Sequence, residues 1–122
     1  MSDTAGKKTK NIKSHYRPSK DFTVSRIKCD NCYYEILKNK NCNTDKVIFM
    51  IHGGSFKVKL IDTYRRIAEK YSKLLDGATV INVDYRVFPQ YEHPAQLHDT
   101  KDVYLELLNQ GIKPESIIFI GD

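Results

Sequence analysis

The sequence predicts an α/β fold in which a largely parallel sheet is flanked by helices. Three short apolar runs at 47–51, 78–83 and 117–120 have the length and composition of strands buried on both faces. Between them lie two segments with helical periodicity, at 60–75 and 95–109. Because strands and helices alternate at this spacing, the chain contains repeated βαβ units with neighbouring parallel strands.

Each expected helix has a face that we expect to point inward. The first has an apolar stripe of Leu60, Ile61, Tyr64, Ile67, Ala68, Tyr71, Leu74 and Leu75, and its opposite face carries Arg65, Arg66, Glu69, Lys70 and Lys73. The second should bury Leu97, Tyr104, Leu107 and Leu108. A short strand is also expected at 33–37, ahead of the βαβ units.

The positive charge is concentrated at the N-terminus. Residues 1–28 contain eight Lys or Arg and two Asp, a net charge of 8 − 2 = +6, so the remainder carries 5 − 6 = −1. We therefore expect a flexible basic tail over 1–28 and a folded domain over 29–122. No aromatic residues interleave the four lysines of 7–13, which argues against a nucleic-acid partner. No apolar run is long enough for a membrane span, and no secretory signal is recognisable, so a cytoplasmic location is expected.

Cys29 and Cys32 have the C-x-x-C spacing of zinc and redox sites. A tetrahedral zinc site needs four ligands, and the sequence offers no second pair at suitable spacing. A redox pair would open a helix after a strand, whereas this one precedes the expected strand at 33–37. We expect reduced thiols and no metal.

Three motifs follow the expected strands, where the working residues of parallel sheets gather. The first is His52-Gly53-Gly54-Ser55-Phe56, and the last is Gly121-Asp122. Between them, Asp84-Tyr85-Arg86 opens a segment that continues through Pro89 and Pro94 to Asp99. One glycine pair after a strand indicates little, but three motifs in this order are more specific.

Together these motifs resemble the hormone-sensitive-lipase-like branch of the α/β hydrolases. The His-Gly-Gly motif resembles that branch's oxyanion motif, and the second segment its D-Y-R-L-A-P…P-A-A-L-E-D pattern. Gly121-Asp122 is similar to the start of its G-D-S-A-G nucleophile elbow. The resemblance extends over about 33–122.

The resemblance implies a carboxylesterase or lipase-like enzyme that hydrolyses a small-molecule ester through serine attack, without a cofactor. It places oxyanion donors on Gly53, Gly54 and Ser55, with His52 and Phe56 supporting their loop. Structural roles fall to Asp84, Tyr85, Arg86, Pro89, Pro94, Asp99, Gly121 and Asp122. The nucleophile is expected directly after Asp122, with the acid and the histidine later still, so these 122 residues alone should be inactive.

Several points stay open in the sequence. Ser55 replaces a third glycine, and its Cβ makes a left-handed backbone harder to adopt. Ser55 itself is not read as a nucleophile, because Lys57 breaks a G-x-S-x-G pattern. Arg86 has two possible carboxylate partners, Asp84 and Asp99. An inactive truncated fragment, or a hydrolase-fold module that binds a ligand without turnover, are alternatives. The hydrolase interpretation requires the loop at 53–56 to lie beside Asp122.

Overall fold

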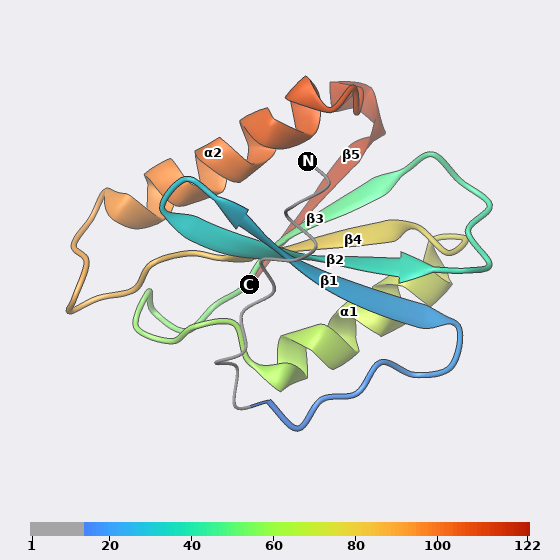
Figure 1. Ribbon diagram of the computed structural model, residues 1–122, viewed down its shortest axis with the longest axis horizontal. Helices are drawn as coiled ribbons and strands as arrows, with labels where there is room; N and C mark the ends of the chain where they lie inside the picture. Colours follow the sequence, from blue (N-terminus) through green and yellow to red (C-terminus); the bar gives the residue numbers. More distant parts are fainter. Residues whose placement is uncertain (1–13) are drawn as a thin grey trace.

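The computed structural model describes residues 14–122, which form a five-stranded sheet between two helices (Figure 1). The elements in chain order are β1 (Phe22–Cys29), β2 (Cys32–Asn39), β3 (Val47–Ile51), α1 (Asp62–Leu74), β4 (Thr79–Asp84), α2 (Ala95–Asn109), the 3-10 turn η2 (Pro114–Ser116) and β5 (Ile117–Gly121). Among these residues, neither helix has the length and apolarity required to cross a membrane.

The sheet is mixed, with strand order β1-β2-β4-β3-β5. β3 is parallel to both of its neighbours, β4 and β5, and these three strands form the βαβαβ unit that the sequence predicts. β2 runs antiparallel to β4 and to β1. Helices α1 and α2 cover opposite faces of the sheet (Figure 1). The α/β class is confirmed, and the parallel arrangement applies to its central and C-terminal strands.

Strand β1 lies inside the segment that we expected to be a flexible tail. Its eight residues pair with β2 in a hairpin, from Phe22 opposite Asn39 to Cys29 opposite Cys32. Phe22 and Ile27 of β1 are both buried and belong to opposite layers of the core. The expectation of a tail through residue 28 is therefore wrong for 22–28, and residues 1–13 lie outside the described part.

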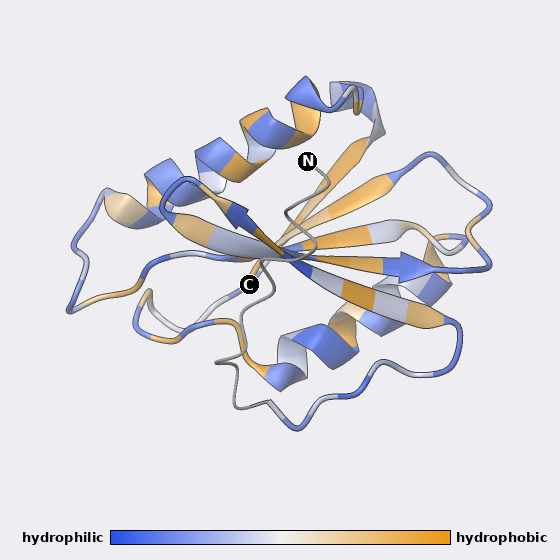
Figure 2. Cartoon of the chain, viewed as in Figure 1, coloured by the Kyte–Doolittle hydropathy of each residue, from blue (hydrophilic) through white to orange (hydrophobic). Residues whose placement is uncertain are grey.

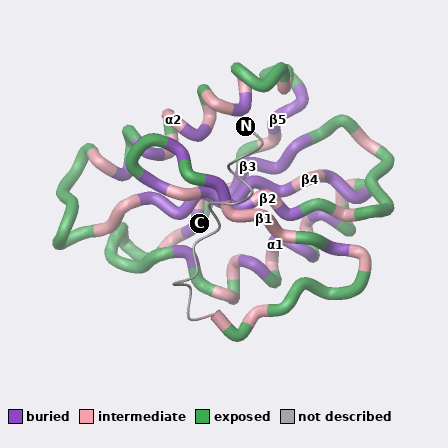
Figure 3. The backbone as a smooth tube through the Cα atoms, viewed as in Figure 1, coloured by how far each residue is buried: buried purple, intermediate pink, exposed green. Residues whose placement is uncertain are grey.

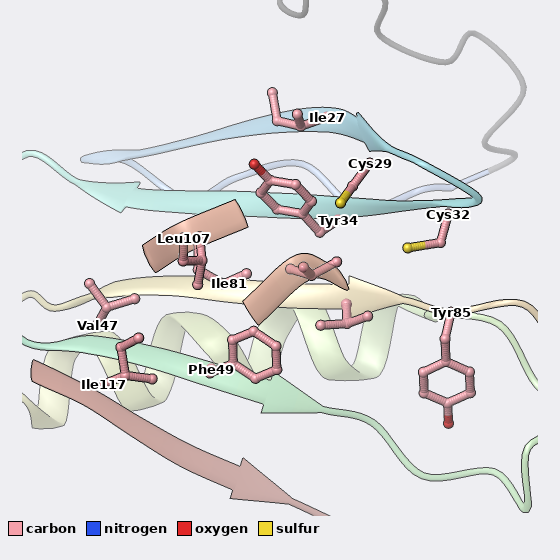
Figure 4. Packing of buried hydrophobic residues seen from close by; sticks show 12 residues of the cluster. Ile27, Cys29, Cys32, Tyr34, Val47, Phe49, Ile81, Tyr85, Leu107 and Ile117 are labelled. Carbon is pink, nitrogen blue, oxygen red and sulfur yellow. The ribbon is translucent and has the colours of Figure 1, made fainter. Parts of the chain in front are cut away.

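The core has two layers, one on each face of the sheet. Alternate residues of β3 serve opposite layers: Phe49 packs towards α2, while Ile48 and Met50 pack towards α1. Figure 2 shows the apolar strands between helices of mixed polarity, and Figure 3 shows the buried central strands. The α2-side layer is seen from close by in Figure 4, where Leu107 lies above the sheet. A strand that is apolar throughout therefore fits this position.

The helix bounds agree closely with the sequence, but the inward faces differ in part. Helix α2 begins and ends as predicted, yet Leu97 is 59% exposed and Val103 is buried in its place. In α1, Leu74 is 76% exposed, whereas Arg65 and Glu69, assigned to the polar face, are buried. Both buried charges have partners, which makes their burial possible: Arg65 pairs with Glu35 of β2, and Glu69 accepts from the Tyr16 hydroxyl and the Ser19 N–H ahead of β1.

Candidate active site

The site forms where two neighbouring parallel strands end. Ile51 is paired with Gly121, so the loop at 52–56 and Asp122 leave the sheet side by side, as the sequence predicts. They border an open hollow of about 510 Å³. Its lining consists of Ile51, His52, Gly53, Gly54, Ser55, Phe56, Tyr85, Gly121 and Asp122. The sheet ladder itself therefore fixes the distance between the loop and the end of β5.

The backbone of the 52–56 loop turns sharply through three consecutive residues with positive φ. The angles are 116° at Gly54, 55° at Ser55 and 60° at Phe56. A Cβ on Gly54 would lie 2.8 Å from the Cβ of Val58, so this position requires glycine. Ser55 adopts the left-handed conformation despite its side chain. The serine in place of a third glycine thus does not prevent the turn.

Two backbone N–H groups of this loop are unengaged. Within residues 14–122, the N–H groups of Gly54 and Ser55 donate no hydrogen bond to protein. Both belong to residues that line the hollow. Consecutive N–H groups in a turn of this kind form a concave site that favours negative charge. The loop therefore offers two donors to an anionic oxygen.

The His52 side chain contacts the backbone of the 52–56 loop. Its side chain is buried, and its ring is stacked on Tyr85 with 4.3 Å between ring centroids. His52 Nδ1 lies 2.7 Å from the Gly53 carbonyl oxygen, which can only accept, so Nδ1 carries a proton. Burial lowers the pKa of His52, which favours the neutral ring. Because C=O and N–H of a trans peptide point in opposite directions, this bond directs the Gly54 N–H away from His52.

Gly53 differs from our expectation, because its N–H is already engaged. It donates to the Tyr64 hydroxyl over 3.2 Å, and that hydroxyl donates in turn to Asp122 Oδ2 over 2.5 Å. A Cβ on Gly53 would lie 3.0 Å from the same carboxylate oxygen. A side chain at this position would therefore crowd the Tyr64 hydroxyl and the Asp122 carboxylate. Tyr64 was missed in the sequence because its position fits the apolar stripe of α1.

The Asp84-Tyr85-Arg86 segment supports the site through two separate sets of ion pairs. Arg86 pairs with Asp99, Nη2 to Oδ1 over 2.8 Å, and its backbone N–H also donates to that carboxylate. Asp99 is 0% exposed. Asp84 instead pairs with Arg26 over 2.6 Å and accepts from the Leu60 N–H. Of the two partners considered for Arg86, the structure selects Asp99.

The remaining predicted residues surround this centre. The Phe88 N–H donates to the Phe56 carbonyl oxygen over 2.8 Å, which joins the loop before Pro89 to the 52–56 loop. Pro94 directly precedes α2, as expected from its position. A smaller apolar hollow of about 280 Å³ adjoins the first and is lined by Ile51, Phe56, Tyr85, His93, Gln96, Leu97 and Thr100.

The C-x-x-C pair flanks the turn between β1 and β2, and the Cys32 thiol lies 4.0 Å from the Asp99 carbonyl oxygen. Cys29 and Cys32 are opposite each other in the hairpin, so both side chains lie on one face of the sheet (Figure 4). Both are buried and free. Burial raises the pKa of both thiols, that of Cys32 to about 12. Among the described residues, no group of three potential ligands could hold a metal ion.

Known proteins are similar to this chain in sequence and in fold. Residues 48–122 match the sequence profile of a family described as the alpha/beta hydrolase fold. The chain belongs to the α/β-hydrolase family. Among curated α/β-hydrolase relatives, an esterase of Acinetobacter venetianus is 39% identical over 63% of this chain and 25% of its own length. The carboxylesterase/phospholipase LipF of Mycobacterium tuberculosis is 32% identical over 88% of this chain and 30% of its own.

Solved structures of α/β hydrolases have a similar fold. EstE5 superposes with a TM-score of 0.77 at 29% identity, over 88% of this chain and 36% of that one. An esterase from the bacterial hormone-sensitive lipase family gives a TM-score of 0.75 at 26% identity, with the same coverage. The chain is thus a hormone-sensitive-lipase-like member of the α/β hydrolases, and it spans about a quarter to a third of the length of the relatives it matches.

Proposed function

We propose that this chain supplies the oxyanion-binding part of a carboxylic ester hydrolase. The observation that carries the proposal is the pair of unengaged N–H groups on Gly54 and Ser55, held beside Asp122 in one hollow. In ester hydrolysis, the attacked carbonyl oxygen gains negative charge in the tetrahedral intermediate. Preset donors stabilise that charge, and losing one costs about 2.7–4 kcal/mol.

On the resemblance to G-D-S-A-G, we propose that the attacking serine directly follows Asp122, beside this hollow. The serine hydroxyl attacks the ester carbonyl, the alcohol departs, and water then releases the acid from the acyl-enzyme. In this scheme Gly54 and Ser55 bind the oxyanion together with the N–H that follows the serine. His52 is a positioning residue, since its neutral ring donates to the Gly53 carbonyl oxygen and so cannot serve as the base at that nitrogen.

The substrate that we propose is a small-molecule ester. Relatives are named esterase, acetyl esterase and carboxylesterase/phospholipase, and the apolar hollow beside the 52–56 loop suits an uncharged acyl or alcohol group. Ser55, the serine in the described 52–56 loop, has the role of a backbone donor in this scheme, and Cys29 at the end of β1 is buried. We therefore expect the 122-residue protein alone to release no p-nitrophenol from p-nitrophenyl butyrate above a protein-free blank.

A chimera tests the proposed function. Residues 14–122 would replace the matching N-terminal third of EstE5, whose remainder would supply the later part of the fold. The chimera should hydrolyse p-nitrophenyl butyrate, and Gly54→Ala should lower its kcat about 100-fold by displacing the donors. Gly111→Ala, another positive-φ glycine but one with open space around it, should leave kcat nearly unchanged.

Two outcomes would contradict the proposal. One is a chimera that melts cooperatively yet shows no hydrolysis. The other is equal activity in the Gly54→Ala and Gly111→Ala chimeras, because the 52–56 loop would then contribute nothing to the reaction.

A further inference from the structure

The Tyr64 hydroxyl occupies the gap between the 52–56 loop and the end of β5. Tyr64 lies in the first turn of α1, directly after the segment that contains the loop. Its oxygen is 3.2 Å from the Gly53 nitrogen and 2.5 Å from Asp122 Oδ2. One side chain therefore contacts both sides of the proposed oxyanion site, which are also joined through the β3–β5 ladder.

The direction of these two hydrogen bonds follows from their chemistry. A backbone N–H can only donate and an ionised carboxylate can only accept. The Tyr64 hydroxyl must therefore give its single proton to Asp122 and accept from Gly53 with a lone pair. The bond to the carboxylate is charge-assisted, and it raises the pKa of Tyr64, so the hydroxyl keeps its proton around neutral pH.

We propose that Tyr64 is a positioning residue, whose hydroxyl joins the Gly53 amide to the Asp122 carboxylate and thereby sets the 52–56 loop against the end of β5. This inference rests on the proposed function, because the loop matters for catalysis only if it binds an oxyanion. Tyr64 consumes the Gly53 N–H, and the donors left for the substrate are those of Gly54 and Ser55.

A neighbouring tyrosine shows that the bridge is not a general feature of this helix face. Tyr71, seven residues later on α1, lines the same hollow of about 230 Å³ between α1 and β5 as Tyr64 does. Within residues 14–122, the Tyr71 hydroxyl makes no hydrogen bond. Tyr71→Phe is therefore a matched control for Tyr64→Phe: each removes one hydroxyl from the same face and the same hollow.

Nuclear magnetic resonance of the 122-residue protein tests the bridge directly. The Gly53 amide should exchange slowly in the unaltered protein, because its N–H donates to the Tyr64 hydroxyl. Tyr64→Phe removes that acceptor and should speed amide exchange at Gly53 by roughly twofold to tenfold. Tyr71→Phe should leave the Gly53 exchange rate unchanged.

Asp122→Asn tests whether the bridge needs an acceptor oxygen at this position. Asparagine still offers an oxygen to the Tyr64 hydroxyl, so the Gly53 amide should stay protected from exchange. An exchange rate at Gly53 that is unchanged in Tyr64→Phe would overturn the proposal, because the Tyr64 hydroxyl would then not hold that N–H.

Thermal unfolding provides a second test of the bridge and can be measured on dilute protein. In a double-mutant cycle on thermal unfolding, Tyr64→Phe and Asp122→Ala should be non-additive, with the double variant melting close to the less stable single variant. Tyr71→Phe and Asp122→Ala should add. Additivity in the Tyr64 cycle would refute the bridge. Neither measurement involves hydrolysis, so the two proposals are tested separately. The Tyr64 bridge can be refuted while the chimera hydrolyses the ester, and it can be supported while the chimera is inactive.

Discussion

Arg65 of α1 and Glu35 of β2 form a buried ion pair across the helix–sheet interface. Arg65 Nη2 lies 2.6 Å from Glu35 Oε2, and Nε lies 2.8 Å from Oε1, so the pair is bidentate. Glu35 also contacts Arg26, which in turn contacts Asp84 at the end of β4. This chain of charges ties α1, the hairpin and the strand end behind the site to one another.

Removing Arg65 should destabilise the protein strongly. Arg65→Leu leaves Glu35 buried with one cationic partner instead of two, and breaking a buried pair in this way costs about 3–5 kcal/mol. Because Arg26 remains, we expect the lower end of that range, measured by urea unfolding. Arg66→Ala, its exposed neighbour, should change stability by less than about 0.5 kcal/mol. Equal effects of the two variants would contradict the importance of the pair.

Acid should weaken the fold through Asp84. Burial alone would raise the pKa of Asp84, but the Leu60 N–H, Lys59 and Arg26 outweigh it and hold the pKa below its ordinary 3.8. A carboxyl with a lowered pKa in the folded state stabilises above its unfolded pKa and loses that contribution as pH falls through the folded value. The melting temperature should therefore drop below about pH 4. Asp84→Asn should melt lower at pH 7 and lose stability less steeply in acid.

Gly54 and Gly111 should respond differently to alanine. Both have positive φ, so both substitutions carry a conformational cost of about 1 kcal/mol. At Gly54 the new Cβ would also meet Val58 Cβ at 2.8 Å, whereas nothing lies within 4 Å at Gly111. We expect Gly54→Ala to unfold at a clearly lower urea concentration than Gly111→Ala. Matching midpoints would mean that the 52–56 loop has room to rearrange.

Strand β5 should promote self-association of the 122-residue protein. It is the last strand in the sheet order, and Phe119 on it is 55% exposed. An open strand edge beside apolar side chains is a template for pairing between molecules. Phe119→Lys should weaken association about fivefold or more, as measured by light scattering against concentration. Leu105→Lys, an exposed apolar residue on α2, serves as the control and should have a smaller effect.

Sequence periodicity was sufficient to predict most of the strands and helices. It was insufficient where contacts between distant segments determine which side chains are buried. The bounds of α2 and the three parallel strands follow from continuous apolar runs and helical spacing. Leu97 shows the limit: periodicity defines a stripe on a helix but not its rotation against the sheet, and Val103 is buried instead. The burial of Arg65 depends on Glu35, thirty residues earlier, and no local pattern reveals that pairing.

For the candidate site, the sequence predicted the neighbours but not every bond. The loop at 52–56 and Asp122 were expected together because both follow parallel strands, and the β3–β5 ladder confirms this. The hydrogen bond of the Gly53 N–H to Tyr64 was not predicted, because its acceptor is a tyrosine that resembles a core residue in the sequence. The polar end of a long amphipathic side chain carries no signal in hydrophobic periodicity.

Because the two hairpin thiols are buried, the remaining cysteine can be labelled selectively. Cys42 is exposed, whereas Cys29 and Cys32 are enclosed by the core, so a maleimide reagent should modify one thiol of the three at neutral pH. Cys42 lies in the turn before β3, at the end of the strand opposite the 52–56 loop. A fluorophore or spin label can therefore be attached without engineering and without disturbing the site, which makes the native chain ready for distance measurements.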